Sequence, residues 1–555
     1  MLDKLPITRV FWVCVTIFRL WNALFVRTSF NPDEYWQSTE VAHRLVFGYG
    51  YLTWEWQEDA QLRSFAHPAL FVGLYKLLEL LNLDSRWVVA YGPRLLQGII
   101  SAANDFFLYK LARTYFNDNA AKWALLCQLF SWFTFYVMVR PFSNCIETMC
   151  TTAALAYWPW KFLEDRRDKK DKDISYKQNN RAVALILAAL GIIFRPTNAV
   201  IWLYLGIGHL WQTRDRAFLM FRLVVPIALV TLLTLLSIDR LGYGQWTVVP
   251  INFFKFNVLD GKDKLYGKHP WSWYFLQGYP AIVGTALPLV IAGYFTVPPS
   301  KKGLGRVSAW TLLVYSGAAH KEFRFILPLL PPAFVYAGYC LHTLEGKSYM
   351  KLYEKMRRKL FQLAIVFIVL PNVLCAFYFS RCHQRAPVEV MDFLADQIQG
   401  THSICVYNFN LAGYIIYLVE NSEVSIHFWT PCHATPYYSY LHQNVSMWFP
   451  DCSPAYDSIY YTNRERFGGC ESHQLERDPK HFLAKLYNLS GDVANDGSWM
   501  ELPTYVVTSD TITAQINELL VVTHFVEVAS FFHSDVSGDA DASEVTSIML
   551  VFKRQ

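Results

Sequence analysis

The chain has 555 residues, of which 53% are hydrophobic, 17% aromatic and 17% charged. Soluble proteins carry about 25% charged residues, so this composition is typical of a membrane protein and excludes disordered, collagen-like and coiled-coil chains. The formal net charge is +5. Because the Lys and Arg residues are bunched between apolar runs rather than spread along one face, we expect no nucleic-acid partner.

Apolar stretches recur along the first 380 residues, and most approach the length of roughly 17 to 25 residues that a bilayer-crossing helix needs. The stretch Ala182–Gln212 is too long for one straight helix, and Arg195-Pro196 interrupts it, so we expect two short helices packed as a broken pair. With this pair, the sequence predicts about 11 crossings. The other expected spans, in chain order, are Val10–Val26, Trp87–Ala112, Ala120–Val139, Cys145–Trp160, Phe218–Ile238, Tyr279–Val297, Val307–Ala319, Phe325–Thr343 and Phe361–Phe379.

Cationic loops predict the orientation of these spans. The loops Lys161–Arg181 and Lys347–Lys359 are rich in Lys and Arg, and short loops of this kind stay cytoplasmic. The N-terminus is then cytosolic, and the first loop, residues 27–86, and a second large loop, residues 239–279, are lumenal. The second loop carries five Lys or Arg residues and is an exception to the charge rule.

From residue 381 to residue 555 the composition changes to strand-like runs separated by polar and Gly/Pro segments. This pattern predicts a soluble lumenal α/β domain, with strands at Ser403–Tyr407, Glu423–Phe428, Thr504–Thr508 and Ser547–Phe552. Two sequons, at Asn444 and Asn488, are expected glycosylation sites and agree with a lumenal location. One or two disulfides are expected among five cysteines whose connectivity stays open: Cys382, Cys405, Cys432, Cys452 and Cys470.

An acidic pair follows the first expected span. Asn31-Pro32-Asp33-Glu34 opens the first loop, and two adjacent carboxylates can supply a general base whose pKa is raised by its neighbour and by partial burial. The alternative is ordinary helix-start chemistry, because Pro is favoured at the first helical position and acids in the first turn. Asp33 and Glu34 are therefore candidate catalytic residues, and spacing alone does not separate the two interpretations.

Four ionisable residues gather in His320-Lys321-Glu322-Phe323-Arg324, between two expected spans. In a helix, Arg324 lies four residues from His320 and three from Lys321, so three donors would converge on one anion. A phosphate at the lumenal membrane surface suits these donors. Anchoring of the chain in the interface is the alternative, but it needs fewer charges.

Other polar residues within spans are weaker candidates. Arg195 is credible as a phosphate contact because it marks the break in the helix pair, whereas Asp105 and Arg140 are expected to support the site or to form buried ion pairs. The segment around Cys432 and His433 invites a metal-site interpretation, but its spacing fits no standard zinc pattern.

These motifs resemble a known family. The Asp33-Glu34 pair and the segment His320–Phe325 are similar to signatures of the endoplasmic-reticulum α-mannosyltransferases that use dolichyl-phosphate mannose and have the GT-C membrane fold. Phe47-Gly-Tyr-Gly50, Thr53-Trp-Glu-Trp56 and Pro431-Cys-His-Ala-Thr-Pro-Tyr-Tyr438 resemble the members that add the third mannose of the GPI anchor. The resemblance covers most of the chain. It implies a polytopic α-helical GT-C membrane protein with a catalytic domain over residues 1–380 and a lumenal α/β domain over residues 381–555.

The resemblance also implies a reaction. Mannose would pass from dolichyl-phosphate mannose to the 2-hydroxyl of the second mannose of a GPI-anchor precursor glycolipid, with inversion to an α1,2 link. Asp33 would take the hydroxyl proton, with Glu34 as the alternative or as an orienting group. His320, Lys321, Arg324 and Arg195 would stabilise the charge on the leaving phosphate, and Glu322 would orient these cations.

We expect no cofactor and no obligatory metal ion, because Lys and Arg can carry a lipid phosphate. The expected partners are the two lipid-linked substrates and membrane lipids, and the expected location is the endoplasmic-reticulum membrane. Two alternatives remain: a sibling mannosyltransferase of the N-glycan lipid precursor, and a flippase for a lipid-linked sugar. The broken helix pair is the feature that favours the flippase.

Overall fold

The computed structural model describes residues 9–160, 173–346, 351–402, 424–453, 470–489, 499–534 and 548–555. The chain forms two compact units. The first comprises the residues up to Val26, Glu55–Leu74 and Tyr91–Tyr378; the second comprises Arg27–Trp54, Tyr75–Ala90 and the chain from Phe379 onward. The second unit therefore draws on two parts of the first loop as well as on the C-terminal residues.

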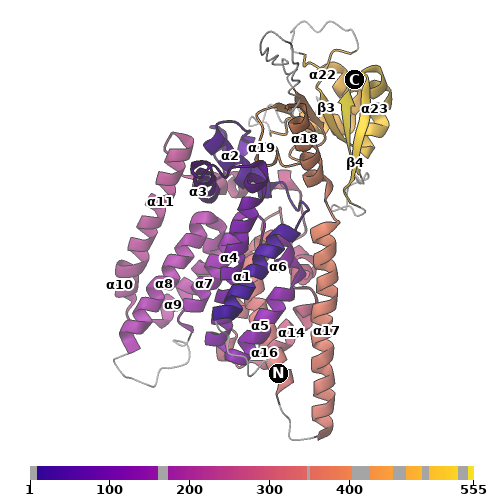
Figure 1. Ribbon diagram of the computed structural model, residues 1–555. Helices are drawn as coiled ribbons and strands as arrows, with labels where there is room; N and C mark the ends of the chain where they lie inside the picture. The colour runs from indigo at the N-terminus through magenta and orange to yellow at the C-terminus, as the bar shows by residue number, and fades with distance from the viewer. Residues whose placement is uncertain are drawn as a thin grey trace, which may run out of the picture. The chain divides into compact units, whose positions relative to one another are not determined.

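The first unit is helical, and its helices lie at or near the positions that the apolar stretches predict (Figure 1). The predicted break at Arg195-Pro196 is confirmed: α8 ends at Phe194, and a single 3₁₀ turn, Pro196–Asn198, leads into α9. Proline cannot continue the hydrogen-bond ladder of α8, which explains the break. The main helices are α1 (Arg9–Phe25), α3 (Ala66–Leu80), α4 (Arg86–Tyr115), α5 (Asp118–Phe130), α6 (Trp132–Val137), α7 (Ser143–Tyr157), α8 (Asp173–Phe194), α9 (Ala199–Gln212), α11 (Val225–Tyr243), α14 (Leu287–Thr296), α15 (Gly303–Ser316), α16 (Leu330–Glu345) and α17 (Lys351–Arg381).

Two expected spans are interrupted. The stretch Ala120–Val139 divides into α5 and α6, because Ser131 is extended and its hydroxyl caps α6 by accepting from the Thr134 amide. The stretch Tyr279–Val297 divides at Gly284, whose φ of 59° is in the left-handed region that a side chain disfavours. The first stretch is therefore two helices rather than one, whereas the second is distorted at Gly284 and remains long and apolar enough to cross a membrane.

Four segments of the described chain are long and apolar enough to cross a membrane: Arg216–Tyr243, Tyr274–Thr296, Phe323–Glu345 and Lys355–Ile398. Helices α11 and α17 expose apolar side chains such as Leu233 and Phe377 rather than burying them. Lipid contact explains such exposure. The membrane character predicted from composition is thus confirmed, whereas the number of crossings stays a prediction.

Helix α16 packs against α5 and α14 at backbone distance. A Cβ atom at Gly338 would lie 2.5 Å from the carbonyl oxygen of Ala120, and one at Gly293 would overlap the carbonyl of Tyr336. Small residues permit this close approach in membrane bundles. The same helix α16 continues directly from the 3₁₀ segment η12, Phe323–Leu329, which contains Arg324.

The second unit contains a mixed five-stranded sheet of order β2-β1-β3-β5-β4. Strand β1 pairs in parallel with β2 and β3, and β5 pairs antiparallel with β3 and β4. Helix α23 (Asp510–Val522) buries Ile512, Ile516 and Leu520 in a core shared with Trp429 of β1. The strands are β1 (Ser425–Trp429), β2 (Ser446–Trp448), β3 (Tyr505–Ser509), β4 (Phe525–Phe532) and β5 (Ile548–Arg554).

Three of the four predicted strands are confirmed as β1, β3 and β5. The fourth, Ser403–Tyr407, lies outside the described residues. The remaining helices of the second unit include α2 (Glu40–Phe47), α18 (Ala386–His402), α19 (Tyr438–Leu441), α21 (Glu471–Arg477) and α22 (Pro479–Leu486).

Candidate functional site

The segment that follows α15, residues 320–324, contains three of the residues predicted to bind phosphate: His320, Lys321 and Arg324. Residues 320–322 are not helical, and Glu322 has the extended dihedrals φ −134° and ψ 153°. Successive side chains of an extended segment point to opposite sides. The expected helical convergence of three donors is therefore wrong, because His320, Glu322 and Arg324 form one cluster while Lys321 points elsewhere.

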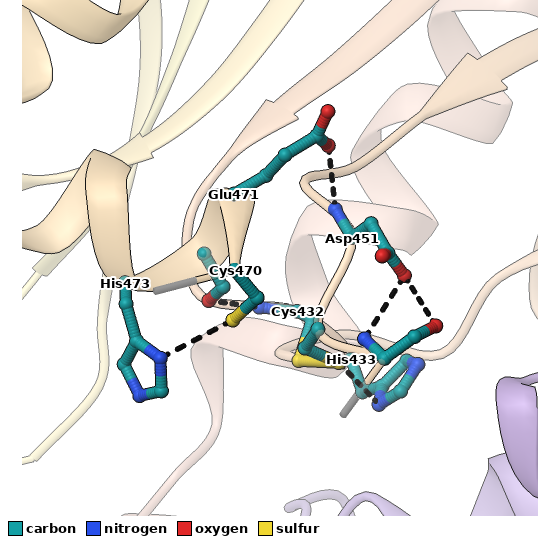
Figure 2. Close-up of a disulfide and its surroundings, with 9 residues drawn as sticks. Cys432, His433, Asp451, Cys470, Glu471 and His473 are labelled. Atoms are coloured by element: carbon teal, nitrogen blue, oxygen red, sulfur yellow. Dashed lines mark hydrogen bonds between the residues drawn. A yellow bond between two sulfur atoms is a disulfide. The ribbon is translucent and has the colours of Figure 1, made fainter. Parts of the chain in front are cut away.

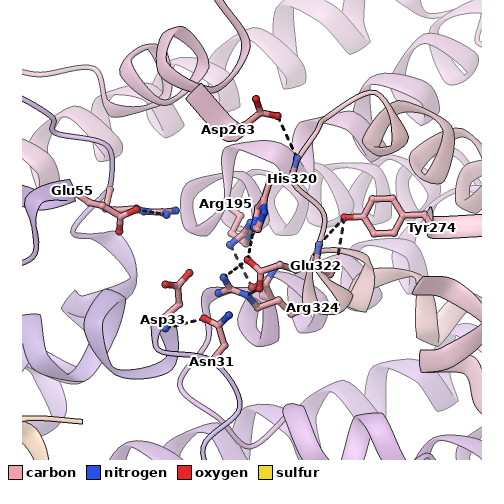
Figure 3. A network of polar contacts seen from close by, with 11 residues as sticks. Asn31, Asp33, Glu55, Arg195, Asp263, Tyr274, His320, Glu322 and Arg324 are labelled. Carbon is pink, nitrogen blue, oxygen red and sulfur yellow. Dashed lines mark hydrogen bonds and ion pairs between the residues drawn. The ribbon is translucent and has the colours of Figure 1, made fainter. Parts of the chain in front are cut away.

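Glu322 is the centre of this cluster (Figure 3). Arg324 donates to it through both Nε, at 2.6 Å, and Nη2, at 2.7 Å, and His320 Nε2 lies 3.0 Å from Glu322 Oε1. Burial alone would raise the pKa of Glu322, but the charge of Arg324 and the hydrogen bonds from His320 and Arg324 outweigh it and lower that pKa. Glu322 is thus a carboxylate that holds the Arg324 guanidinium and the His320 imidazole in place.

Lys321 is buried, and its ammonium donates to two main-chain carbonyls, those of His269 at 3.1 Å and of Ala318. Burial lowers its pKa, and the charge of Asp263 opposes that shift. Lys321 therefore braces the loop. Its predicted contact with a phosphate stays a prediction, and such a contact would compete with these two hydrogen bonds.

The second large loop fixes the same segment from the other side, which the sequence did not predict. Asp263 Oδ2 accepts from the Ala319 amide at 2.8 Å and from the His320 amide at 3.4 Å. The Tyr274 hydroxyl accepts from the Glu322 amide, also at 3.4 Å. More than 45 positions separate these partners in the chain, so no local spacing marks them.

Arg195 lies beside the Glu322 cluster. Its guanidinium is 5.3 Å from the centre of the Phe325 ring, and the guanidinium of Arg324 is 5.4 Å from the same centre. Glu147 of α7 is 3.3 Å from Arg195 Nε, and Ser143 accepts from Nη1 at 3.1 Å. The structure therefore brings Arg195 and Arg324 to the same aromatic ring, and the Glu147 carboxyl group contacts the Arg195 guanidinium.

Asp105 and Arg140 are fully buried. Asp105 accepts two hydrogen bonds from Arg19, at 2.7 and 2.9 Å, and thereby links α4 to α1. Arg140 donates to the Tyr136 carbonyl at 2.9 Å, with its guanidinium 4.3 Å from the Tyr136 ring. These contacts hold helices and turns together.

The acidic pair belongs to the second unit. Asp33 is partly exposed at the start of a helix, and the Asn31 side chain accepts from its amide at 3.0 Å. Glu34 is fully buried, and its Oε1 accepts from the Phe30 amide at 3.2 Å and from the Ser29 hydroxyl at 3.3 Å. The two predicted candidates therefore differ, because Glu34 stabilises the local turn while Asp33 has the accessible carboxylate.

The helix that begins at Asp33 packs against the segment Pro431–His442 of the same unit. Glu40 accepts from the Tyr437 amide at 2.8 Å and from the Ser439 amide at 3.2 Å. Burial raises the pKa of Glu40 to about 7, although hydrogen bonds from Ser439 and neighbouring amides lower it in part. His43 Nε2 lies 3.0 Å from His442 Nδ1. Sequence reasoning missed Glu40 and His43 because their partners lie about 400 positions away.

The predicted disulfide chemistry is present at Cys432–Cys452 (Figure 2). In the part of the chain that the structure describes, one group of potential metal ligands, Cys432, His433 and Cys452, lies within 4.8 Å. A disulfide occupies both sulfurs, so they are not available as thiolate ligands. Cys470 belongs to a separate contact, with its Sγ 3.2 Å from His473 Nδ1.

The predicted glycosylation sites differ in exposure. Asn444 is exposed just before β2, and Asn488 is partly buried after α22. The third residue of the second sequon, Ser490, lies outside the described residues. Glycosylation at Asn444 and Asn488 stays a prediction.

The arrangement of helices places the chain in a structural class. The crystal structure of ArnT from Cupriavidus metallidurans bound to undecaprenyl phosphate matches with a TM-score of 0.54 at 12% identity, covering 98% of this chain and 97% of that chain. The apo oligosaccharyltransferase from Archaeoglobus fulgidus matches with a TM-score of 0.52 at 11% identity, covering 98% and 76%. The fold is that of the GT-C membrane glycosyltransferases.

Sequence similarity defines the family within this class. The chain belongs to the Alg9-like mannosyltransferase family, whose profile matches residues 10–442. It is 38% identical to human GPI alpha-1,2-mannosyltransferase 3, over 93% of this chain and 82% of that protein. It is also 37% identical to the mannosyltransferase APTG1 of Arabidopsis thaliana, over 98% and 92%, and 32% identical to GPI mannosyltransferase 3 of Yarrowia lipolytica, over 95% of each.

Proposed function

We propose that this chain transfers mannose from dolichyl-phosphate mannose to the 2-hydroxyl of the second mannose of a GPI-anchor precursor. The observation that carries the proposal is its similarity, over nearly the whole chain, to relatives named GPI mannosyltransferase 3 in animals and fungi. The cationic cluster around Glu322 supports a lipid-phosphate donor, because it gathers an imidazole and two guanidinium groups within a membrane unit. We place the enzyme in the endoplasmic-reticulum membrane with this cluster on the lumenal side.

The reaction is a single displacement. The acceptor oxygen attacks the anomeric carbon while the bond between that carbon and the phosphate oxygen breaks, so that the β-linked donor gives an α1,2 product and dolichyl phosphate. Negative charge grows on the phosphate in the transition state. Arg324, Arg195 and His320 offset this charge from fixed positions, and preorganised donors of this kind are a large term in catalysis.

Asp33 is the proposed base. Its carboxylate is the more accessible of the acidic pair, whereas Glu34 is buried and accepts hydrogen bonds from residues 29 and 30. A base takes the hydroxyl proton as the oxygen attacks, and such proton transfer contributes about 10²- to 10⁴-fold to a rate. Glu34 then shapes the turn that presents Asp33.

We also propose that the transfer needs no metal ion. Glu322 is the carboxylate nearest to the cations in sequence, and Arg324 and His320 already engage both of its oxygens. It acts as a partner of cations rather than as a metal ligand. Full activity in excess chelator is the expected result, and loss of activity that added Mg²⁺ or Mn²⁺ restores would contradict it.

The experiment is mannose transfer by the purified full-length protein in detergent, with dolichyl-phosphate mannose and a GPI precursor that carries two mannoses. Asp33→Asn should lower kcat by about 10²- to 10⁴-fold, because the amide cannot accept the proton. Asp59→Asn is the matched control, since Asp59 is an exposed aspartate of the same loop and should retain activity.

Three other outcomes would each favour a different interpretation of the protein or of its base. Transfer to an N-glycan precursor but not to the GPI precursor would keep the enzyme class and change the acceptor. Binding of the donor without any product in detergent would favour a flippase. An Asp33→Asn variant that keeps its kcat would show that the base is another residue.

A further inference from the structure

Glu147 is a buried carboxyl group of α7 that takes no part in the reaction proposed above. It faces the break between α8 and α9, since its Oε2 lies 3.3 Å from Arg195 Nε and its Oε1 accepts from Asn198 Nδ2 at 3.0 Å. Replacing a buried ion pair by apolar side chains is often neutral or stabilising. Folding stability alone therefore does not account for Glu147, and its contact with Arg195 points to a second role.

Asn198 holds the carboxyl group of Glu147 in a fixed position. The same Nδ2 that donates to Glu147 also lies 2.8 Å from Thr151 Oγ1, and Asn198 Oδ1 accepts from Trp202 Nε1 at 2.6 Å. A Cβ atom at Gly191 would lie only 2.8 Å from Asn198 Oδ1, so the amide packs against the backbone of α8. The position of the carboxyl group is thus set from α7, α8 and α9 together.

Side chains of α7 hold two of the three guanidinium nitrogens of Arg195. Nε contacts Glu147, and Nη1 donates to Ser143 Oγ at 3.1 Å and to Asn144 Oδ1 at 3.4 Å. Among the residues that the structure describes, none accepts a hydrogen bond from Nη2. The first turns of α7 therefore orient the guanidinium and leave Nη2 available to an oxygen of a phosphate.

We propose that Glu147 is a positioning residue of the transfer reaction, whose carboxylate orients the Arg195 guanidinium so that Nη2 meets the leaving phosphate. This inference rests on the proposed function, in which Arg195 offsets charge on that phosphate. A donor is most effective when its position is fixed before the charge develops, and a misplacement of about 1 Å can cost about 10²-fold in rate. Glu147 acts through Arg195 and needs no contact of its own with the donor.

The test compares kcat per folded molecule for four forms of the purified full-length protein in the detergent assay: the parent, Glu147→Gln, Arg195→Gln and the double variant. Glu147→Gln keeps an oxygen for Asn198 but loses the charge that holds Arg195, so kcat should fall by about 10- to 100-fold. In the Arg195→Gln background the same change should lower kcat by less than about twofold, because two residues that act as a unit are not additive. Glu147→Asp keeps the charge at a shorter reach and should retain more kcat than Glu147→Gln.

Affinity for dolichyl phosphate, the leaving lipid, is a second readout that does not depend on transfer. Glu147→Gln should bind this lipid about fivefold more weakly than the parent, a part of what one hydrogen bond to a charged group contributes. The double variant should bind it as Arg195→Gln does. If the parent makes no mannosylated product but binds dolichyl phosphate with this dependence, the proposed function fails while the role of Glu147 is retained.

Asp215→Asn is the matched control. Asp215 contacts another buried arginine, Arg181 near the start of α8, at 2.7 Å, so this variant breaks an ion pair away from the candidate site and should keep the kcat of the parent. Equal kcat in Glu147→Gln and the parent would overturn the proposal, as would an equal loss in both Arg195 backgrounds. A loss in Asp215→Asn as large as that in Glu147→Gln would also overturn it, because any broken ion pair would then have the same effect.

Discussion

Removing Arg324 should lower the folding stability through the loss of its contact with Glu322, and lower the transfer rate through the loss of its proposed contact with the phosphate. Arg324 is buried and donates to Glu322 through two nitrogens, at 2.6 and 2.7 Å. The variant Arg324→Ala leaves the carboxylate of Glu322 largely buried with His320 as its remaining partner in this cluster. Breaking one side of a buried ion pair costs about 3 to 5 kcal/mol of folding free energy. Loss of a charge-stabilising donor separately lowers kcat by about 10²- to 10³-fold.

A second substitution distinguishes the two effects. In Glu322→Gln/Arg324→Ala the uncompensated charge is gone, so most of the lost folding free energy should return. The charge that offsets the leaving phosphate remains absent, and kcat should stay low. Thermal unfolding in detergent gives the first quantity, and transfer from dolichyl-phosphate mannose at saturating acceptor gives the second.

One result would refute this reasoning. If the double variant regained kcat together with stability, Arg324 would serve only to neutralise Glu322, and its assignment to the phosphate would fail. Arg324→Lys gives an independent check. It keeps the charge but cannot form the paired contact, so kcat should fall between those of the parent and Arg324→Ala.

Three further predictions concern the second unit, and thermal unfolding of the purified protein measures all of them. Glu40→Ala removes the acceptor of the Tyr437 and Ser439 amides and should lower the free energy of unfolding by about 1 to 3 kcal/mol for each amide left without it. Glu40→Gln keeps an acceptor oxygen and should lower the free energy of unfolding less. Equal losses in the two variants would contradict this prediction. Burial and the nearby His442 lower the pKa of His43 from 6.5 to about 3, so the folded state binds fewer protons than the unfolded state below pH 6.5. Stability from His43 is then complete above pH 6.5 and decreases by about 1 kcal/mol by pH 5.5, and His43→Gln should flatten this dependence. Cys432→Ser/Cys452→Ser opens a loop of sequence separation 20 and should cost about 3 kcal/mol, a loss that a reductant should reproduce in the parent.

The helices were predictable because each depends on a local property, the length of an apolar run. Pro196 also marks the end of α8, since a proline lacks the amide hydrogen that the helical hydrogen bonds need. The interruptions at Ser131 and Gly284 were not marked in this way. Each apolar run continues through the interruption, and a capping hydroxyl or a left-handed glycine ends the helix.

The candidate site was predictable in its composition and not in its geometry. Charged residues within apolar sequence identify His320–Arg324 because charges at membrane depth are costly. Their directions depend on whether the backbone is helical or extended, and the contacts of Asp263 and Tyr274 determine that. Those partners come from a loop that the charge rule treated only as an exception. Likewise, nothing local to Glu40 reveals that the donors to its carboxylate are amides of the C-terminal region.

The close backbone contacts at Gly338, between α16 and α5, and at Gly293, between α14 and α16, limit how the first unit can move. Two helices whose backbones touch cannot slide past each other by one turn, because the side chains one turn away along α16, Phe334 and His342, would then lie where Gly338 meets the backbone of α5. α5, α14 and α16 therefore behave as one body. Arg324 is joined to that body through η12, so its guanidinium is a fixed reference point during turnover. Any adjustment to a bulky glycolipid must occur in the substrate or in the loops that approach this point, while the cation itself keeps its position.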